Sequence, residues 1–324
     1  MHPVNLLPCT PPAWAKGGHL QTIWGHVLPS PRLRELGTPH VLSLPDGDRL
    51  HLTLYEGTIP ATTVLLHGLG GDAHADYMER TAGVCLDLGH AVILVNFRGC
   101  GQGWGLSRGF YHAGRGEDIS EVIAFSRTQW PGHRQIAVGF SLGANALLCL
   151  LTGLRGTSLP DAAISLNAPI DLALGAKVLQ QGGNRVYDQY FFRRLRRSLY
   201  RRVRENLLEP QPLALRTVKS LQQFDDVFTA VQGGFGGVEN YYAQCSTHLH
   251  LSKITVPTIL LTAADDPIVP VAPYLAAKLS PAVQMHIEPT GGHLGYITKR
   301  PTPLGTRRWQ DYAIREAIKS LLAD

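Results

Sequence analysis

Short apolar runs that alternate with helical stretches constrain the fold of this 324-residue chain more than any other feature. The runs are rich in Val, Ile and Leu, and most are unbroken, which is typical of strands that are covered on both faces. Strands that alternate with helices predict an α/β fold with a mostly parallel central sheet and helices on both faces. The predicted strands cover residues 62–68, 91–97, 135–140, 162–168, 257–263 and 283–289, and the predicted helices cover 73–88, 118–129, 142–154, 273–279 and 307–322.

The segment HVLSLPDGDRLHLTLY, residues 40–55, precedes this pattern. It has two segments of alternating polarity around Asp46 and Gly47. An Asp-Gly pair between alternating segments is a strong turn signal. We therefore expect an antiparallel hairpin before the first parallel strand.

The regular alternation breaks between residues 171 and 247. This stretch is mostly helix-forming and contains no convincing core strand. An insertion between two sheet strands commonly forms a lid over a site at the carboxyl ends of the strands. We predict a core of residues 1–170 and 248–324, in which 1–39 is an N-terminal extension that packs on the core, and a helical lid of residues 171–247.

The composition is that of a globular protein, with 44% apolar and 17% charged residues. No run of about 18 apolar residues predicts a membrane-spanning helix. The first residues lack the positive and apolar regions of a signal peptide, so we expect a cytoplasmic protein. The five cysteines are scattered without a C-x-x-C pair and predict neither a disulfide framework nor a zinc site.

The net charge of +5 includes seven arginines within Arg193–Arg204, so the rest of the chain sums to −2. Such local basicity argues against a nucleic-acid-binding protein. Two interpretations of the arginine run stay open. It is either a solvated helix of the lid or a peripheral contact with anionic lipid surfaces or a phosphate-bearing substrate. The sequence does not indicate the oligomeric state.

The segment QIAVGFSLGANALLCLL carries the pattern G-x-S-x-G between a predicted strand and a predicted helix. A nucleophilic serine has to project from a sharp turn of this kind, and Gly139 and Gly143 leave out the side chains that would collide there. Ser141 is therefore the candidate nucleophile.

A serine hydroxyl needs a base within hydrogen-bonding distance and an acid that orients this base. After a strand-to-helix elbow of this kind the partners follow in the chain order Ser, acid, His. His293 comes after the last predicted strand in a glycine-rich loop, and we predict it as the base. The histidines weighed against it after Ser141 are His248, His250 and His286.

The acid is expected after the preceding strand, in PTILLTAADDPIVPV. Asp266 stands directly before the turn Pro-Ile-Val-Pro and is the predicted acid. Asp265 is the alternative, in which case the neighbouring carboxylate would shape the loop.

A tetrahedral intermediate also needs hydrogen-bond donors for its oxyanion. We predict the backbone N–H groups of Leu142, which follows the nucleophile, and of Leu69, in the glycine-rich loop after an early strand. His67 in this loop is predicted to have a structural role.

The tetrapeptide GGHL occurs twice, at residues 17–20 and 291–294. His19 in the first copy precedes Ser141 and does not fit the order of a triad. We expect the first copy to pack against the core near the site.

The chain resembles the serine-nucleophile α/β-hydrolases, and specifically the YheT/EMB8-like subfamily, which includes ABHD1- and ABHD3-type proteins. The motifs that carry the resemblance are GHLQTIW (18–24), HGLGG (67–71), NFRGCG (96–101), GFSLGAN (139–145), FDDVFT (224–229), ENYY (239–242), ADDPIVP (264–270) and GGHLGYI (291–297). The resemblance implies an α/β-hydrolase fold, a triad of Ser141, Asp266 and His293, and hydrolysis of carboxylic esters, with medium-chain or lipid-like acyl esters as plausible substrates. The mammalian members carry an N-terminal membrane anchor, which we do not expect here.

Other chemistries find little support. G-x-G-x-x-G fails in every register of FRGCGQGWG, and neither a phosphate-binding G-K-[ST] loop nor H-E-x-x-H occurs. We expect no cofactor and no metal. The alternatives left open are acyl transfer or thioester hydrolysis by the same triad, and a non-catalytic binding protein on the same scaffold.

Overall fold

The predicted strands form neighbouring strands of one sheet in the computed structural model, which describes residues 4–33, 36–208 and 217–323. The sheet has eight strands in the order β1-β2-β4-β3-β5-β6-β7-β8, and β3 to β8 run parallel. The predicted mostly parallel sheet is therefore confirmed. The strands are β1 (Thr38–Ser43), β2 (Arg49–Tyr55), β3 (Ala61–Leu66), β4 (Ala91–Asn96), β5 (Arg134–Phe140), β6 (Ala162–Leu166), β7 (Thr258–Ala263) and β8 (Val283–Glu288).

The expected hairpin is confirmed as well. Strands β1 and β2 pair antiparallel from Thr38 opposite Leu54 to Ser43 opposite Arg49, and β2 pairs antiparallel with β4. The Asp46-Gly47 turn joins them, and Gly47 has a φ of 87°, a left-handed conformation that glycine adopts without strain.

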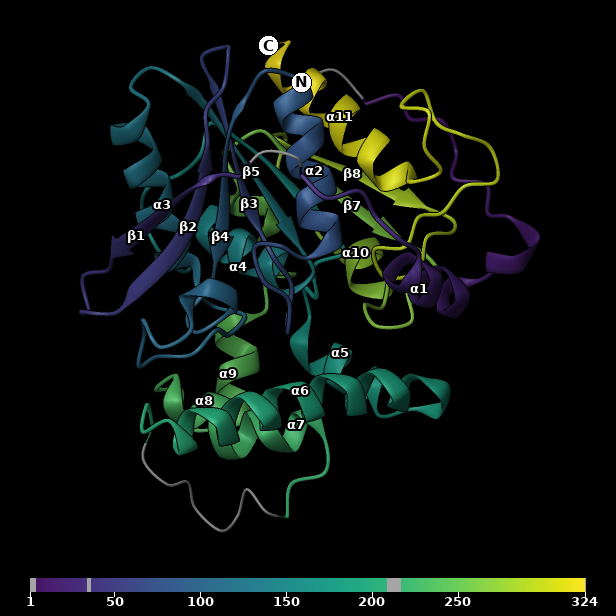
Figure 1. The fold of residues 1–324 in the computed structure, drawn as a ribbon. Coiled ribbons are helices and arrows are strands. Elements are labelled where there is room, and N and C mark those ends of the chain that lie inside the picture. The colour runs from purple at the N-terminus through teal and green to yellow at the C-terminus, as the bar shows by residue number, and fades with distance from the viewer. Residues whose placement is uncertain (1–3, 34–35, 209–216, 324) are drawn as a thin grey trace.

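Helices cover both faces of the sheet (Figure 1). Successive residues of β4 belong to two different apolar clusters: Ile93 packs with α3 and α4, whereas Val92 packs with α2 and α11. Because both faces of the sheet are covered by apolar clusters, the strands are unbroken apolar runs in the sequence. The covering helices are α2 (Asp76–Asp87), α3 (Gly116–Gln129), α4 (Leu142–Leu151) and α11 (Trp309–Leu322).

The chain between β6 and β7 forms helices and no strand in its described part. These inserted helices lie together below the sheet in Figure 1. They have a small apolar cluster of their own, which includes Phe192, Leu199 and Phe228. They are α5 (Leu172–Leu179), α6 (Arg185–Arg204), α7 (Leu221–Phe224), the π-helix η5 (Asp225–Thr229), α8 (Ala230–Gln232) and α9 (Val238–Cys245).

Two further helices lie close to the loops that follow β7 and β8. Helix α10 (Ala272–Ala276) was expected, whereas α1 (Gly18–Val27) in the N-terminal extension was not. In the described ranges no helix is both long and apolar enough to cross a membrane.

Candidate active site

Ser141 forms the sharp turn between a strand and a helix. Strand β5 ends one residue before it and helix α4 begins one residue after it. Ser141 has φ 51° and ψ −119°, a conformation that side-chain-bearing residues rarely adopt and that is typically held by surrounding structure at functional sites. The turn therefore places Ser141, which is 9% exposed, at the carboxyl end of β5.

The two glycines of the pattern leave no room for a side chain. A Cβ on Gly139 would lie 2.6 Å from Cα of Ala144, and one on Gly143 would lie 2.4 Å from the carbonyl oxygen of His67. Both distances are shorter than contacts between carbon and backbone atoms allow. The steric reason that the sequence suggested for these glycines is thus confirmed.

His293 and Asp266 complete a chain of hydrogen bonds with the serine. The hydroxyl oxygen of Ser141 lies 2.9 Å from Nε2 of His293, and Nδ1 of the same ring lies 2.8 Å from Oδ2 of Asp266. The side chain of His293 is 8% exposed and that of Asp266 is fully buried. The structure therefore brings together, from three separate loops, the residues predicted as nucleophile, base and acid.

The carboxylate of Asp266 is held by backbone and side-chain donors. Its Oδ1 accepts hydrogen bonds from the N–H groups of Ile268 and Val269, and its Oδ2 accepts one from the side-chain amide of Asn167 at 2.8 Å. Buried carboxylates need such donors, since an unpaired buried charge is costly. Oδ2 of Asp266 therefore has two partners, the side-chain amide of Asn167 and Nδ1 of His293.

Asp265 has a different environment. Its Oδ1 accepts hydrogen bonds from the N–H groups of Gly291, at 2.9 Å, and Gly292, at 2.8 Å. It therefore shapes the loop that carries His293 and does not contact the imidazole. Of the two acids weighed from the sequence, Asp266 is the one that meets the histidine.

The predicted oxyanion donors, Leu69 and Leu142, line the same cavity as Ser141. Leu142 is the first residue of α4, and a first-turn N–H has no acceptor within its own helix. Leu69 lies in a turn closed by a hydrogen bond from the N–H of Gly71 to the oxygen of Gly68, which leaves the N–H of Leu69 outside this bond. A Cβ on Gly68 would lie 3.1 Å from Cβ of Ser141, so the turn lies directly against the nucleophile.

His67 supports this turn from inside the core. It is completely buried; its Nδ1 lies 2.8 Å from the oxygen of Gly68, and its Nε2 accepts a hydrogen bond from the N–H of Phe97. Burial lowers the pKa of His67 to about 4. A neutral ring with a hydrogen bond at each nitrogen is structural, as predicted.

Ser141 opens into an apolar cavity of about 120 Å³ between the sheet and the inserted helices. Leu69, Ser141 and Leu142 line it from the core. Most of the facing side chains are apolar, so the cavity suits a hydrocarbon group. Those from the inserted helices include Leu172, Phe191, Leu195, Leu221, Phe224 and Phe228.

One buried carboxyl group also lines this cavity. Asp225 begins the π-helix η5, and its Oδ2 accepts a hydrogen bond of 2.9 Å from the hydroxyl of Tyr242. The pKa of Asp225 is raised to about 6: burial is the main cause and the charge of Asp188 adds to it, whereas the hydrogen bonds with Thr229 and Tyr242 act in the opposite direction. Asp225 and Tyr242 belong to the FDDVFT and ENYY motifs, and their contact joins η5 to α9.

Helix α1 begins within the first GGHL copy and packs against the loop of the second. The hydroxyl of Thr22 accepts a hydrogen bond of 2.8 Å from the N–H of His293. The side-chain amide of Gln21 bonds both the N–H and the oxygen of Ile297. The expectation that the first copy packs against the core near the site is confirmed.

His19 does not reach Ser141 but contacts the inserted helices. Its Nδ1 lies 3.0 Å from the hydroxyl of Tyr187 on α6, and the two rings are stacked with centroids 5.7 Å apart. Helix α1 therefore links α6 to the loop of the second copy.

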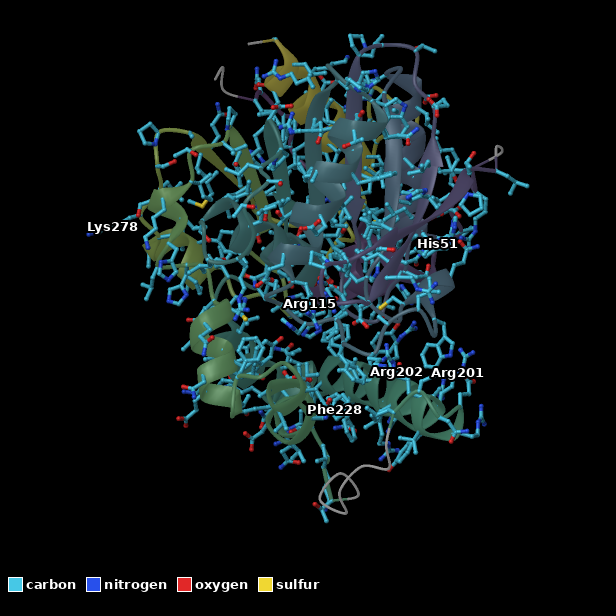
Figure 2. The ribbon with its side chains drawn as sticks, turned by 90° about the vertical axis from the view of Figure 1, so that its left-hand side faces the viewer. His51, Arg115, Arg201, Arg202, Phe228 and Lys278 are labelled. Carbon is cyan, nitrogen blue, oxygen red and sulfur yellow. The ribbon has the colours of Figure 1, made fainter. Side chains whose placement is uncertain are left out.

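The arginine run lies on α6 and divides into buried and exposed members. Arg202 is buried: its guanidinium lies over the ring of Phe110 at 4.2 Å and donates to the oxygens of Ser107 and Gly109. Arg201 and Arg202 lie beside each other where the inserted helices meet the core (Figure 2). The run is thus partly a structural anchor, which the sequence did not indicate.

Sequence reasoning missed Thr22, Asn167 and Tyr77 as supports of the site. Tyr77 accepts a hydrogen bond from the N–H of Gly68, and Asn167 has a φ of 47° at the carboxyl end of β6. Position at a strand end was the signal that could have indicated Asn167. Nothing local marks Thr22 or Tyr77.

No cluster of His, Cys, Asp and Glu among the described residues has an arrangement that would hold a metal ion. The chemistry of the site therefore has to be argued from the side chains and backbone groups above.

Comparisons with known proteins place the chain in a family. The α/β-hydrolase fold family matches residues 63–300. The chain is 32% identical to the putative esterase YheT of Escherichia coli over 94% of its own length and 91% of that protein. It is 28% identical to the embryogenesis-associated protein EMB8 of Picea glauca, over 83% of this chain, and 29% identical to the medium-chain fatty acid ethyl ester synthase/esterase 2 of Saccharomyces cerevisiae, over 78%. It spans 61% and 60% of the lengths of these last two proteins.

Among solved structures, the esterase Pf2001 of Pyrococcus furiosus superposes with a TM-score of 0.57 over 90% of this chain and 99% of that chain. At 17% identity this likeness supports the fold alone. Together with the family match over most of the chain and the relatives that share most of its length, it shows that this protein belongs to the α/β-hydrolase family, in its YheT/EMB8-like subfamily.

Proposed function

We propose that this protein is a serine carboxylic-ester hydrolase that acts through an acyl-enzyme intermediate. The observation that carries the proposal is the unbroken chain of hydrogen bonds from Ser141 through His293 to Asp266, at 2.9 and 2.8 Å. A serine on a strained elbow, a base within reach and a buried acid are the parts that nucleophilic acyl transfer needs.

His293 takes the proton of Ser141 while the serine oxygen attacks the ester carbonyl. The N–H groups of Leu69 and Leu142 stabilise the oxyanion of the tetrahedral intermediate. Collapse of this intermediate breaks the bond to the alcohol, which takes the proton from His293. A water molecule, deprotonated by His293, then attacks the acyl group and frees the acid. Asp266 keeps a proton on Nδ1 and stabilises the imidazolium in both halves of the reaction.

The lining of the cavity supports short- to medium-chain or lipid-like acyl esters as substrates. Phe191, Leu195 and Phe224 face the space next to Ser141, and such walls bind hydrocarbon chains through the hydrophobic effect. The name of the yeast relative, a medium-chain fatty acid ethyl ester synthase/esterase, agrees with this class.

We assign residues 171–247 the role of a lid on a core of residues 1–170 and 248–324. Side chains of the inserted helices share the cavity with Ser141, so a substrate that reaches the serine contacts them. The shape of the lid would then set the length of the acyl chain.

A fluorophosphonate probe tests the chemistry, because it reacts only with an activated serine. We expect the wild type to be labelled and to hydrolyse nitrophenyl esters in a chain-length series, and Ser141→Ala and His293→Ala to do neither. His19→Ala is the matched control, since it alters the other GGHL copy, and it should keep most of the turnover. Absence of labelling in the wild type, or equal labelling of Ser141→Ala, would rule out the proposal.

The same triad could also pass the acyl group to an alcohol, and the name of the yeast relative includes a synthase activity. Reactions with added ethanol separate the two outcomes. Fatty acid as the main product supports hydrolysis, whereas ethyl ester as the main product supports transfer.

A further inference from the structure

Helix α1 turns its apolar side to solvent. Leu20, Ile23, Trp24 and Val27, at the helical spacing of three and four residues, are exposed by 41%, 46%, 36% and 62%. The side that faces the protein carries Gln21, which is fully buried, and residues with short side chains. A helix in an isolated globular protein normally shows the opposite orientation.

The exposed apolar side continues onto the inserted helices. Trp14 meets the ring of Trp24 edge-on at 5.7 Å, and His26 on α1 meets the ring of Tyr190 on α6 at 6.2 Å. Tyr190 is itself 41% exposed, and Val186, one turn before it, is 61% exposed. Helices α1 and α6 therefore present one continuous apolar and aromatic surface.

Further along α6 the same surface carries positive charge. Arg193, Arg194 and Arg197 follow Tyr190 at three, four and seven residues, so they lie on the same side of the helix. All three are exposed. Arg194 reaches the hydroxyl of Tyr190, whereas Arg193 and Arg197 form no ion pair with any residue that the structure describes.

Neither helix exposes an acidic side chain. Helix α1 contains no Asp or Glu, and the only acid of α6 is Asp188, which is buried. The exposed residues of the two helices are thus apolar, aromatic, histidine or arginine, without a negative charge. A partner that complements them has hydrocarbon and negative charge close together.

We propose that Ile23, Trp24, Val27, Tyr190, Arg193 and Arg197 form a docking face for an anionic phospholipid bilayer. Apolar helix faces flanked by Arg bind at the boundary of headgroups and acyl chains, and Trp and Tyr rings lie at the depth of the headgroups. Arginines near a membrane of anionic lipids are attracted by its negative surface potential. The apolar residues enter the interface and the arginines contact the lipid phosphates.

The part of the docking face on α1 lies opposite the side of this helix that contacts the loop of His293. The same helix α1 that exposes Ile23 and Trp24 bonds the N–H of His293 through Thr22. Arg194 also lies over Gly70, next to the predicted oxyanion donor Leu69. A docked molecule would therefore place the region of Ser141 close to the lipid surface. The docking itself does not depend on ester hydrolysis.

Vesicle sedimentation tests the docking face in the Ser141→Ala protein, which cannot consume lipid. The vesicles are phosphatidylcholine alone and phosphatidylcholine with phosphatidylglycerol. We expect strong binding to the anionic vesicles only, and weaker binding as salt is added. Absence of binding to both kinds of vesicle, or equal binding to both, overturns the proposal.

Variants locate the binding site. Ile23→Glu should weaken binding to anionic vesicles at least about tenfold, because it removes one apolar side chain from the interface. Arg193→Gln with Arg197→Gln should weaken it about thirtyfold. Val41→Glu is the matched control: Val41 is 44% exposed, on the edge strand β1, and its replacement should leave binding unchanged.

All variants should keep the melting temperature of the parent, so that lost binding is not lost folding. Binding by Ile23→Glu equal to that of the parent overturns the proposal. A dimer in solution that Ile23→Glu converts to a monomer also overturns it, because this face would then be covered by a second copy of the chain.

Discussion

The hydroxyl of Thr22 accepts a hydrogen bond of 2.8 Å from the backbone N–H of His293, although 271 positions separate the two residues. The same hydroxyl donates to the oxygen of Gly18 in its own helix. The two segments approach closely, since a Cβ on Gly25 would lie 2.5 Å from Cα of Gly295. The N-terminal helix therefore helps to fix the loop that carries the proposed base.

Thr22→Val should lower kcat for a soluble nitrophenyl ester about tenfold, because a half-buried N–H without an acceptor costs about 1–3 kcal/mol and the loop of His293 would shift to relieve it. KM should change little, since Thr22 does not line the cavity. Thr22→Ser keeps the hydroxyl and should restore kcat. Steady-state kinetics of the three proteins, at equal melting temperature, separate positioning from stability. An unchanged kcat in Thr22→Val would show that the loop does not need this bond.

The two neighbouring acids should respond very differently to the same substitution. Asp266→Asn should lower kcat about 10⁴-fold, because an amide in this place favours the wrong tautomer of His293. Asp265→Asn keeps an oxygen that can accept from Gly291 and Gly292, so it should change kcat by about tenfold at most. Parallel measurement of kcat in both variants checks this, and a larger loss in Asp265→Asn would reverse the assignment.

The sheet could be predicted from the sequence because its strands are buried on both faces. Ile93 and Val92 point to opposite clusters and both are apolar, which makes β4 visible as an unbroken run. The chain order of serine, acid and histidine then limited the candidates for the base to the few histidines after Ser141. The structure places one of them, His293, within hydrogen-bonding distance of Ser141.

Helix α1 could not be predicted in the same way. Its apolar residues face solvent, and its contact with the core depends on Gln21, Thr22 and the close approach of Gly18 and Gly25 to the loops after β7 and β8. Such contacts depend on complementary shape over a long separation in sequence, which no local periodicity encodes. The structural role of Arg202 could not be predicted either, because nothing in a run of arginines indicates which one is buried.

Arg98 should be a main determinant of stability. Its buried guanidinium bonds Asp118 through Nε and Nη2 and bonds Asp46 and Asp48 through Nη1. Removal of one partner from a buried ionic network leaves unpaired charge, so Arg98→Met should lower the free energy of unfolding by about 3–5 kcal/mol. Arg127→Met is the matched control, because the pair of Arg127 with Asp161 is exposed and should contribute at most about 1 kcal/mol. Urea unfolding at neutral pH measures both, and equal losses would contradict the prediction.

Asp225 should make the stability depend on pH. Burial raises the pKa of this carboxyl in the folded protein to about 6, whereas an unfolded Asp has a pKa of about 3.9. Because the folded pKa is the higher one, the stabilising contribution of the protonated group is complete below about pH 4 and is lost as the pH rises through about 6. Asp225→Asn keeps a neutral side chain at every pH and so does not incur this loss.

The free energy of unfolding of Asp225→Asn, relative to that of the wild type, should therefore increase by about 2–3 kcal/mol between about pH 4 and pH 7. Urea unfolding of both proteins across this range measures the difference, and other titrating groups cancel because both proteins share them. Asp226→Asn is the matched control, since it makes the same substitution at the next residue of η5, which is exposed and does not line the cavity. A constant difference between Asp225→Asn and the wild type would contradict the prediction, because the carboxyl at the wall of the cavity would then be ionised at the same pH in the folded and unfolded chains.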